Sequence, residues 1–104
     1  MPHLIRYKLK PDRVAENERL VTDVFEELAT TRPPGLRYAV FRLDDGTSFA
    51  HLVAHASEAD RDRLTGLPAF RHFVEGIRER CEEPPARAEL SVVGGYGIFE
   101  EVRS

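Results

Sequence analysis

Residues 36–56 read LRYAVFRLDDGTSFAHLVAHA, two apolar runs joined by a short polar turn. Side chains alternate between two sets over residues 36–43 and again over residues 48–56. A period of two is typical of β-strands, because successive side chains point to opposite faces of a sheet. Asp44-Asp45-Gly46 favours a tight turn, since glycine accepts a positive φ without steric cost. The stretch therefore predicts an antiparallel hairpin.

Helical patterns lie on both sides of this hairpin. Upstream, apolar residues from Val14 to Leu28 recur at intervals of three and four, and charged residues fill the positions between them. This period predicts an amphipathic helix, with Asp12 as its expected N-cap and Pro33-Pro34 beyond its end. Downstream, residues 57–60 read SEAD and resemble a capping box, which predicts a short helix that ends at Gly66.

A second long helix is expected from Pro68, because proline suits the first helical position. Its apolar stripe follows offsets of three and four, which are typical of the buried side of a helix. The stripe consists of Phe70, Phe73, Val74, Ile77 and Cys81. Glu83-Pro84-Pro85 is expected to end this helix, since prolines cannot continue it.

Alternating segments near the two ends of the chain complete the pattern. Residues 3–9 and 88–92 each alternate apolar and polar side chains, and Gly94-Gly95 is expected to bend the chain before an apolar tail that pairs as a further short strand, carrying Tyr96, Ile98 and Phe99. The resulting order is the ferredoxin-like, split β-α-β-β-α-β arrangement. We predict one α+β domain over residues 1–104, with a four-stranded antiparallel sheet and both helices on one face.

Composition excludes several classes of protein. Fifteen Lys and Arg against 18 Asp and Glu give a net charge of −3 without a basic stripe, which argues against nucleic-acid binding. One cysteine permits neither an intrachain disulfide nor a cysteine-based zinc site. No apolar run reaches the roughly 18 residues of a membrane span, and the N-terminus does not resemble a signal peptide. A cytoplasmic protein without a membrane or nucleic-acid partner is expected.

The face of the predicted sheet that the helices do not cover is expected to pack against a partner. Two helices cover one face of a four-stranded sheet, so in a monomer the other face would be wet. The two hairpin strands are apolar on both faces, however: Tyr38, Val40, Phe49 and Val53 form one set, and Leu52 with the alanines belongs to the opposite set. Either set would expose several hundred Å² of apolar surface, which monomers rarely do. We therefore expect a homodimer with sheet against sheet.

Two features resemble a known group of proteins. The first strand runs into Lys10-Pro11-Asp12, and residues 64–73 read LTGLPAFRHF. Together with the order of elements, these segments resemble the dimeric α/β-barrel superfamily and, within it, the antibiotic biosynthesis monooxygenase family, over about residues 3–95.

The resemblance implies two sheets that form a shared dimeric barrel, and a ligand cleft between the helices and the sheet of each subunit. Some members oxidise polycyclic aromatic or quinol substrates with molecular oxygen and without a cofactor, and others degrade haem. The haem-degrading branch carries an asparagine on the first strand and a tryptophan before the second long helix. This chain has no tryptophan, its asparagine is Asn17 on the first helix, and Val74 takes the haem-ligand position. We therefore expect no cofactor.

Two histidines are the candidate catalytic residues. His51 and His55 share one face of the strand over residues 48–56. They cannot bind one metal ion within a subunit, because four residues at about 3.3 Å separate them by roughly 13 Å. No metal site is predicted, although a two-fold axis would leave room for symmetry mates to meet. A histidine pKa near 6.5 suits a general base at neutral pH. The structural alternative is a polar group hydrogen-bonded within the sheet interface.

Aromatic residues are the candidate ligand contacts. Tyr7 and Tyr38, on the first and second strands, would point hydroxyls into a cleft, and phenylalanines would line its walls. For each of them a purely structural role in the core is the alternative. The predicted ligand-binding set is Tyr7, Phe25, Tyr38, Phe49, Phe70 and Phe73.

These observations support three hypotheses of function. The first is a homodimer that binds a small apolar or aromatic metabolite and acts as a cofactor-independent monooxygenase, in which His51 or His55 removes a phenolic proton. The second is a non-catalytic dimeric binding or stress-response module. The third is an isomerase or lyase on the same barrel. An open cavity bordered by Phe49, Phe70 and Phe73 would favour the first hypothesis.

Overall fold

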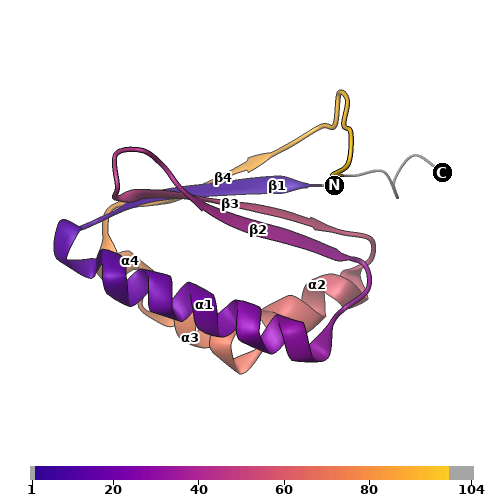
Figure 1. Ribbon diagram of the computed structural model, residues 1–104, viewed down its shortest axis with the longest axis horizontal. Coiled ribbons are helices and arrows are strands. Elements are labelled where there is room, and N and C mark those ends of the chain that lie inside the picture. Colours follow the sequence, from indigo (N-terminus) through magenta and orange to yellow (C-terminus); the bar gives the residue numbers. More distant parts are fainter. Residues whose placement is uncertain (1, 99–104) are drawn as a thin grey trace.

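The computed structural model describes residues 2–98 and shows one sheet with the helices on one side of it (Figure 1). The elements in chain order are β1 (His3–Leu9), the 3-10 turn η1 (Pro11–Arg13), α1 (Val14–Thr31), β2 (Leu36–Arg42), β3 (Ser48–His55), α2 (Glu58–Thr65), α3 (Pro68–Glu75), α4 (Ile77–Arg80) and β4 (Cys81–Glu89). The strand order is β2-β3-β1-β4, and all neighbours are antiparallel. The predicted ferredoxin-like α+β fold is confirmed.

The turn of the central hairpin is fixed by the residues that predicted it. Gly46 has a φ of +81°, and one carboxylate oxygen of Asp45 accepts hydrogen bonds from the backbone N–H groups of Thr47 and Ser48. The Ser48 hydroxyl donates to the other oxygen at 2.6 Å. The hydrogen bonds from Ser48 and Thr47 lower the pKa of Asp45 to about 2. The turn therefore holds β2 and β3 in a single register.

The helix starts agree with the sequence in one place and differ in another. Ser57 caps α2, because its hydroxyl oxygen accepts a hydrogen bond from the Asp60 backbone N–H and its hydroxyl donates to the Asp60 side chain. The prediction of Asp12 as the N-cap of the first helix is wrong. Pro11 starts a 3-10 turn that contains Asp12, and α1 begins at Val14 without a side-chain cap.

The second half of the chain differs most from the prediction. The expected long helix is interrupted at Gly76, so that α3 and α4 are separate and Cys81 begins a strand. Pro84-Pro85 does not end a helix but lies inside β4, because β4 is an edge strand whose outer N–H groups need no partner in the sheet. The pairing of β1 with β4 shifts register on both sides of Lys8.

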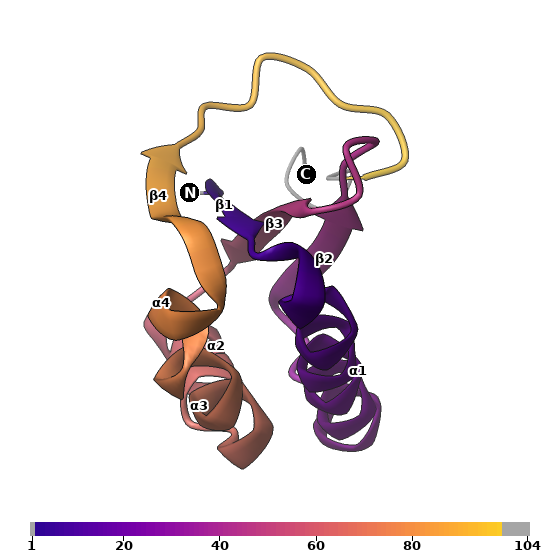
Figure 2. The same ribbon diagram turned by 90° about the vertical axis from the view of Figure 1, so that its left-hand side faces the viewer.

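The tail also departs from the expected strand. The fourth strand covers Cys81–Glu89 rather than residues 88–92, and no strand follows it within the described residues. Residues 90–98 pass over the side of the sheet away from the helices (Figure 2). The side chains of Val93 and Tyr96 are almost fully exposed. Phe99, part of the predicted apolar tail, lies outside the described residues.

The sheet separates two faces. Paired residues on neighbouring strands share a face, and the row Val40–His51–Ile5 lies toward the helices, which supply the rest of the core. The opposite side, which we call the open face, carries the charged Arg6 and Arg37 and the apolar residues Leu4, Ala39, Phe41, Ala50, Leu52, Ala54 and Ala88. Figure 2 shows α1 beneath one half of the sheet and α2, α3 and α4 beneath the other half.

Candidate functional site

A cavity of about 280 Å³ lies between the sheet and the group of helices α2, α3 and α4. Its wall is mainly apolar, with contributions from Ile5, Val53, Leu64, Phe70, Phe73, Val74 and Ile77. Its polar lining comes from His51, Tyr7 and Tyr38, and from His3, Arg61, Thr65 and Arg87. An apolar cavity with a few convergent polar groups is the usual form of a small-molecule site.

His51 lies in the middle of β3 and is buried beneath the helices. Its Nε2 lies 2.8 Å from the Tyr7 hydroxyl, and its Nδ1 lies 2.8 Å from the Tyr38 hydroxyl. The three strands β1, β3 and β2 thus bring one imidazole between two phenols. We call this group the Tyr7–His51–Tyr38 array.

The array continues into the core through two residues of the helical layer. Asn17, on α1, donates from its amide nitrogen to the Tyr7 hydroxyl at 2.9 Å. Arg80, at the end of α4, donates to the Asn17 side-chain oxygen at 3.1 Å and to the Phe73 backbone carbonyl at 2.7 Å. Its guanidinium lies 5.1 Å from the centroid of the Phe73 ring. A hydrogen-bonded chain therefore runs from Arg80 to Tyr38.

Burial controls the charges of this chain. It lowers the pKa of His51 to about 4, so the imidazole is neutral at pH 7. It also raises the pKa of both Tyr7 and Tyr38, which keeps the two phenols protonated. Arg80 has its pKa lowered by burial, yet guanidinium remains protonated in proteins. No carboxylate of residues 2–98 lies within ion-pair distance of Arg80.

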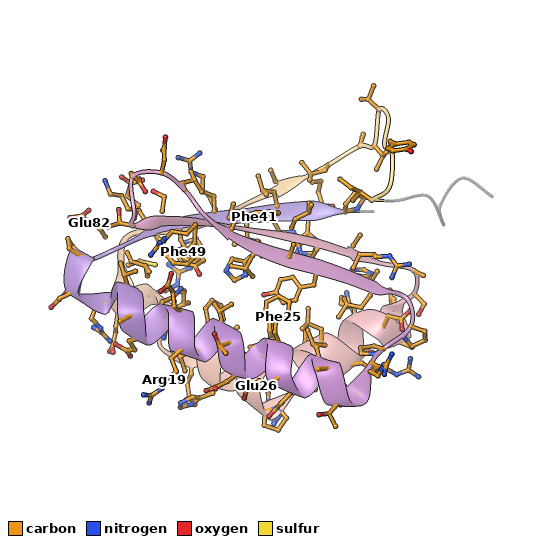
Figure 3. The ribbon with its side chains drawn as sticks, viewed as in Figure 1. Arg19, Phe25, Glu26, Phe41, Phe49 and Glu82 are labelled. Carbon is orange, nitrogen blue, oxygen red and sulfur yellow. The ribbon has the colours of Figure 1, made fainter. Side chains whose placement is uncertain are left out.

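The phenylalanines of the predicted ligand-binding set fall into two groups. Phe70 and Phe73 line the cavity directly. Phe25 stacks on Tyr38 with ring centroids 5.0 Å apart, and Phe49 stacks on Tyr7 at 5.7 Å. Figure 3 shows Phe25 and Phe49 between the sheet and the helices. These two rings pack against the tyrosines and do not line the cavity.

The two histidines predicted as catalytic lie in different surroundings. His51 lines the cavity, whereas His55 does not. His55 is half-buried at the end of β3, where its ring meets that of His3 edge-on at a centroid distance of 6.2 Å. His3 lines the cavity, and its buried Nδ1 has no hydrogen-bond partner among the described residues. Burial and the nearby Arg87 lower the pKa of His3.

From the sequence, Asn17 was noted only as the asparagine on the first helix, and Arg80 was not singled out. Each lies on an apolar stripe, however. Asn17 is three residues after Val14 and four before Val21, and Arg80 is three residues after Ile77. A polar residue at such a position must find a buried partner, which is a signal for an internal network.

Within residues 2–98, no group of three or more His, Cys, Asp or Glu side chains has the geometry to hold a metal ion. Over the same part of the chain, none of the helices combines the length and apolar character needed to cross a bilayer.

Comparison with models of known families finds no match, and comparison with curated protein sequences finds none either. Solved structures do match. One is assigned as an antibiotic biosynthesis monooxygenase from Nitrosomonas europaea and aligns with a TM-score of 0.74 at 16% identity, over 89% of this chain and 98% of that one. Another, from Bacteroides thetaiotaomicron, has a TM-score of 0.76 at 18% identity, over 89% of each chain.

A third structure, from Caulobacter crescentus and of the same assignment, aligns with a TM-score of 0.72 at 19% identity, over 89% of each chain. Identities this low establish shared architecture and leave the chemistry to be argued from the site itself. The chain therefore has the ferredoxin-like fold of the antibiotic biosynthesis monooxygenase proteins, as its resemblance to that family predicted.

Proposed function

We propose that this chain binds a small aromatic molecule in the cavity and oxidises it with molecular oxygen, as a cofactor-independent monooxygenase. The observation that carries the proposal is an apolar cavity of about 280 Å³ with the Tyr7–His51–Tyr38 array at its wall. An apolar cavity of about 150 Å³ holds one benzene ring, so this volume suits a ligand of about two rings. Phe70 and Phe73 would pack against those rings.

The array would act on an oxygen atom of the ligand. Both nitrogens of His51 are engaged by tyrosines, so His51 reaches the ligand through the Tyr38 hydroxyl rather than by direct contact. This differs from the simple general base expected from the sequence, because the lowered pKa also makes the imidazole a weaker base. His55 has no place in this proposal, since it does not line the cavity.

The proposed reaction converts a phenol to a quinone. Release of the phenolic proton to solvent water gives an electron-rich anion, whose ring carbon opposite the oxygen adds molecular oxygen as a peroxide. The peroxide takes up one proton from water, and loss of one water, formed from that proton, the hydrogen of the carbon and the outer peroxide oxygen, leaves a second carbonyl. The protein would contribute orientation of the ring, exclusion of water and stabilisation of the anion.

The proposal includes a homodimer. The open face is apolar across three strands, in the row Ala39–Leu52–Leu4, and Phe41 is 54% exposed beside it. The tail passes over this side of the sheet, but its Val93 and Tyr96 side chains are almost fully exposed and so do not pack against the face. A second copy with sheet against sheet would bury it, at about 25 cal/mol per Å² before the cost of association. The cytoplasmic location stays a prediction.

Oxygen consumption with 1-naphthol tests the proposed activity. Its conversion to 1,4-naphthoquinone and water uses one molecule of oxygen, and labelled O₂ should place one labelled atom in the quinone. His51→Gln should reduce the rate at least tenfold, because it removes the centre of the array. His55→Gln is the matched control and should retain the rate. Equal rates for both variants would remove His51 from the mechanism.

The alternative is a binding protein without catalysis. It is favoured by the hydrogen bonds on both His51 nitrogens and by the lowered pKa of the ring, since a fully satisfied neutral histidine is also what a structural role requires. Binding of 1-naphthol without oxygen uptake or quinone formation would support this alternative.

A further inference from the structure

The donor and the acceptor of each hydrogen bond in the chain from Arg80 to Tyr38 can be assigned in turn, starting at Arg80. A guanidinium group can only donate hydrogen bonds. The side-chain atom of Asn17 that faces Arg80 must therefore be the amide oxygen, 3.1 Å from the Arg80 Nε. The amide nitrogen of Asn17 consequently faces Tyr7 and donates to its hydroxyl oxygen.

The proton of the Tyr7 hydroxyl has one available acceptor. The Tyr7 side chain is buried, and among the described residues its hydroxyl contacts only Asn17 and His51. Because Asn17 already donates to it, Tyr7 would leave a buried O–H unsatisfied unless that proton points to His51 Nε2. Tyr7 therefore donates to His51.

The same assignment of donors and acceptors continues through the His51 imidazole to Tyr38. A neutral imidazole carries one proton, and with Nε2 as the acceptor this proton lies on Nδ1. Nδ1 then donates to the Tyr38 hydroxyl oxygen, 2.8 Å away. The Tyr38 hydroxyl does not donate its proton to His51, and it has no other hydrogen-bond partner among residues 2–98. Tyr38 is half-buried and lines the cavity.

We infer that Tyr38 offers a hydrogen-bond donor to the cavity, so that the site selects ligands with an acceptor oxygen, such as a ketone, a quinone or a phenolate, over ligands that only donate. Each donated hydrogen bond polarises the next, and the chain starts at a buried cation, which strengthens the final donor. Arg80 and Asn17 are positioning residues that set this preference without touching the ligand. The inference rests on the proposed ligand site and specifies that the array stabilises an oxygen anion rather than removing its proton.

Three bicyclic probes of similar shape test the preference. Indene has no polar group, 1-indanone adds only an acceptor, and indole adds only a donor. Titration calorimetry on the wild-type protein should show 1-indanone binding about tenfold more tightly than indene, as one hydrogen bond allows, and indole no more tightly than indene. Tyr38→Phe should remove the advantage of 1-indanone. Tyr96→Phe is the matched control, because Tyr96 is 98% exposed, and should keep it.

Asn17→Asp provides a test that a merely structural role would not pass. A carboxylate at this position keeps a partner for Arg80 but only accepts, so Tyr7 would donate to it instead of to His51. The chain would then reverse, and Tyr38 would present a lone pair to the cavity. Indole should become the tighter probe by a similar factor. The probes are neutral, so the added negative charge does not produce this exchange by itself.

Each outcome decides the question. If indole binds the wild type more tightly than 1-indanone, or if Tyr38→Phe leaves the advantage of 1-indanone in place, the inference is wrong while the aromatic site stands. If none of the three probes binds, the proposed function fails and the inference with it. Far-UV circular dichroism checks that each variant is folded, and the Tyr38→Phe result is sufficient where Asn17→Asp is not folded.

Discussion

The two faces of the sheet differ in how their polar groups are accommodated. The helix-covered face contains a histidine, two tyrosines and, from the helical layer, Asn17 and Arg80, all joined by hydrogen bonds. The open face carries alanine, leucine and phenylalanine side chains together with the charged Arg6 and Arg37. Such sheets usually bury their apolar face and wet their polar one. Here polar groups are also buried within the mainly apolar covered face, where we infer a ligand site, and the open face keeps a large apolar share, from which we infer self-association.

The largest expected effect concerns the covered face. Arg80 is 2% exposed, and Arg80→Met would leave the Asn17 side-chain oxygen and the Phe73 carbonyl without their donor. Two buried unsatisfied acceptors should lower the free energy of unfolding by about 4 kcal/mol. Urea denaturation measures this change. Arg78→Met, at an exposed neighbouring position, should change it by less than about 0.5 kcal/mol. Equal effects of the two variants would show that the network does not stabilise the fold.

A second effect on the covered face depends on pH. The folded pKa of His51, about 4, lies below the unfolded value near 6.5, so the unfolded chain binds more protons between these values. Stability is therefore complete above about pH 6.5 and is lost as the pH falls toward 4, by about 3 kcal/mol. Urea denaturation at one protein concentration, from pH 7 to pH 4, measures the loss.

His51→Gln isolates the histidine from the carboxylates that also titrate in this range. The difference in unfolding free energy between wild type and variant should shrink toward acid pH. A difference that stays constant from pH 7 to pH 4 would show that His51 does not titrate as its burial requires.

The open face is tested by Phe41→Glu. Phe41 lies on the edge strand β2 within this face, and a carboxylate in its place should weaken the proposed dimer by at least a hundredfold, or about 2.7 kcal/mol. Sedimentation over a range of concentrations measures the dissociation constant. Val93→Glu places the same charge on a fully exposed side chain of the tail and should leave association unchanged. A wild-type protein that sediments as a single chain at micromolar concentration would contradict the proposed role of this face.

The smallest expected effect concerns the cap of α2, which belongs to neither face of the sheet. Its size is a reference for the effects predicted above. Ser57 caps α2 through the Asp60 backbone N–H, and Ser57→Ala should lower the unfolding free energy by about 1 kcal/mol. Ser91→Ala, at an exposed position after β4, should have no measurable effect. A loss at Ser57 as large as that at Arg80 would mean that the buried network contributes no more than an ordinary cap.

The sequence predicted the first half of the fold better than the second, for physical reasons. The hairpin, β1 and α1 follow strong local signals, namely alternation, a glycine turn and a continuous apolar stripe. The break at Gly76 and the start of β4 at Cys81 do not. Pro84-Pro85 was interpreted as the end of a helix. The pair is tolerated in β4 because β4 lies at the edge of the sheet, and an edge position is a property of the assembled sheet rather than of the local sequence.

The candidate site was predictable in Tyr7, Tyr38, Phe70 and Phe73, while Phe25 and Phe49 do not line the cavity and the network was not predicted. The alternation of β3 placed His51 on one face, but it placed His55 there equally, and only the tertiary fold distinguishes them. The lowered pKa of His51 comes from burial beneath helices, which no local pattern reveals. Asn17 and Arg80 were visible only as polar interruptions of apolar stripes, and their meeting depends on packing between elements 63 residues apart.

The two prolines of β4 also restrict how copies of this molecule can assemble. A free strand edge offers alternating N–H and C=O groups that another chain can extend, which is the usual route to filaments and aggregates. Pro84 and Pro85 have no N–H to offer, and the register shifts beside them disturb the regular ladder. Growth of the sheet past this edge is therefore disfavoured, whereas β2, the strand at the other edge, contains no proline.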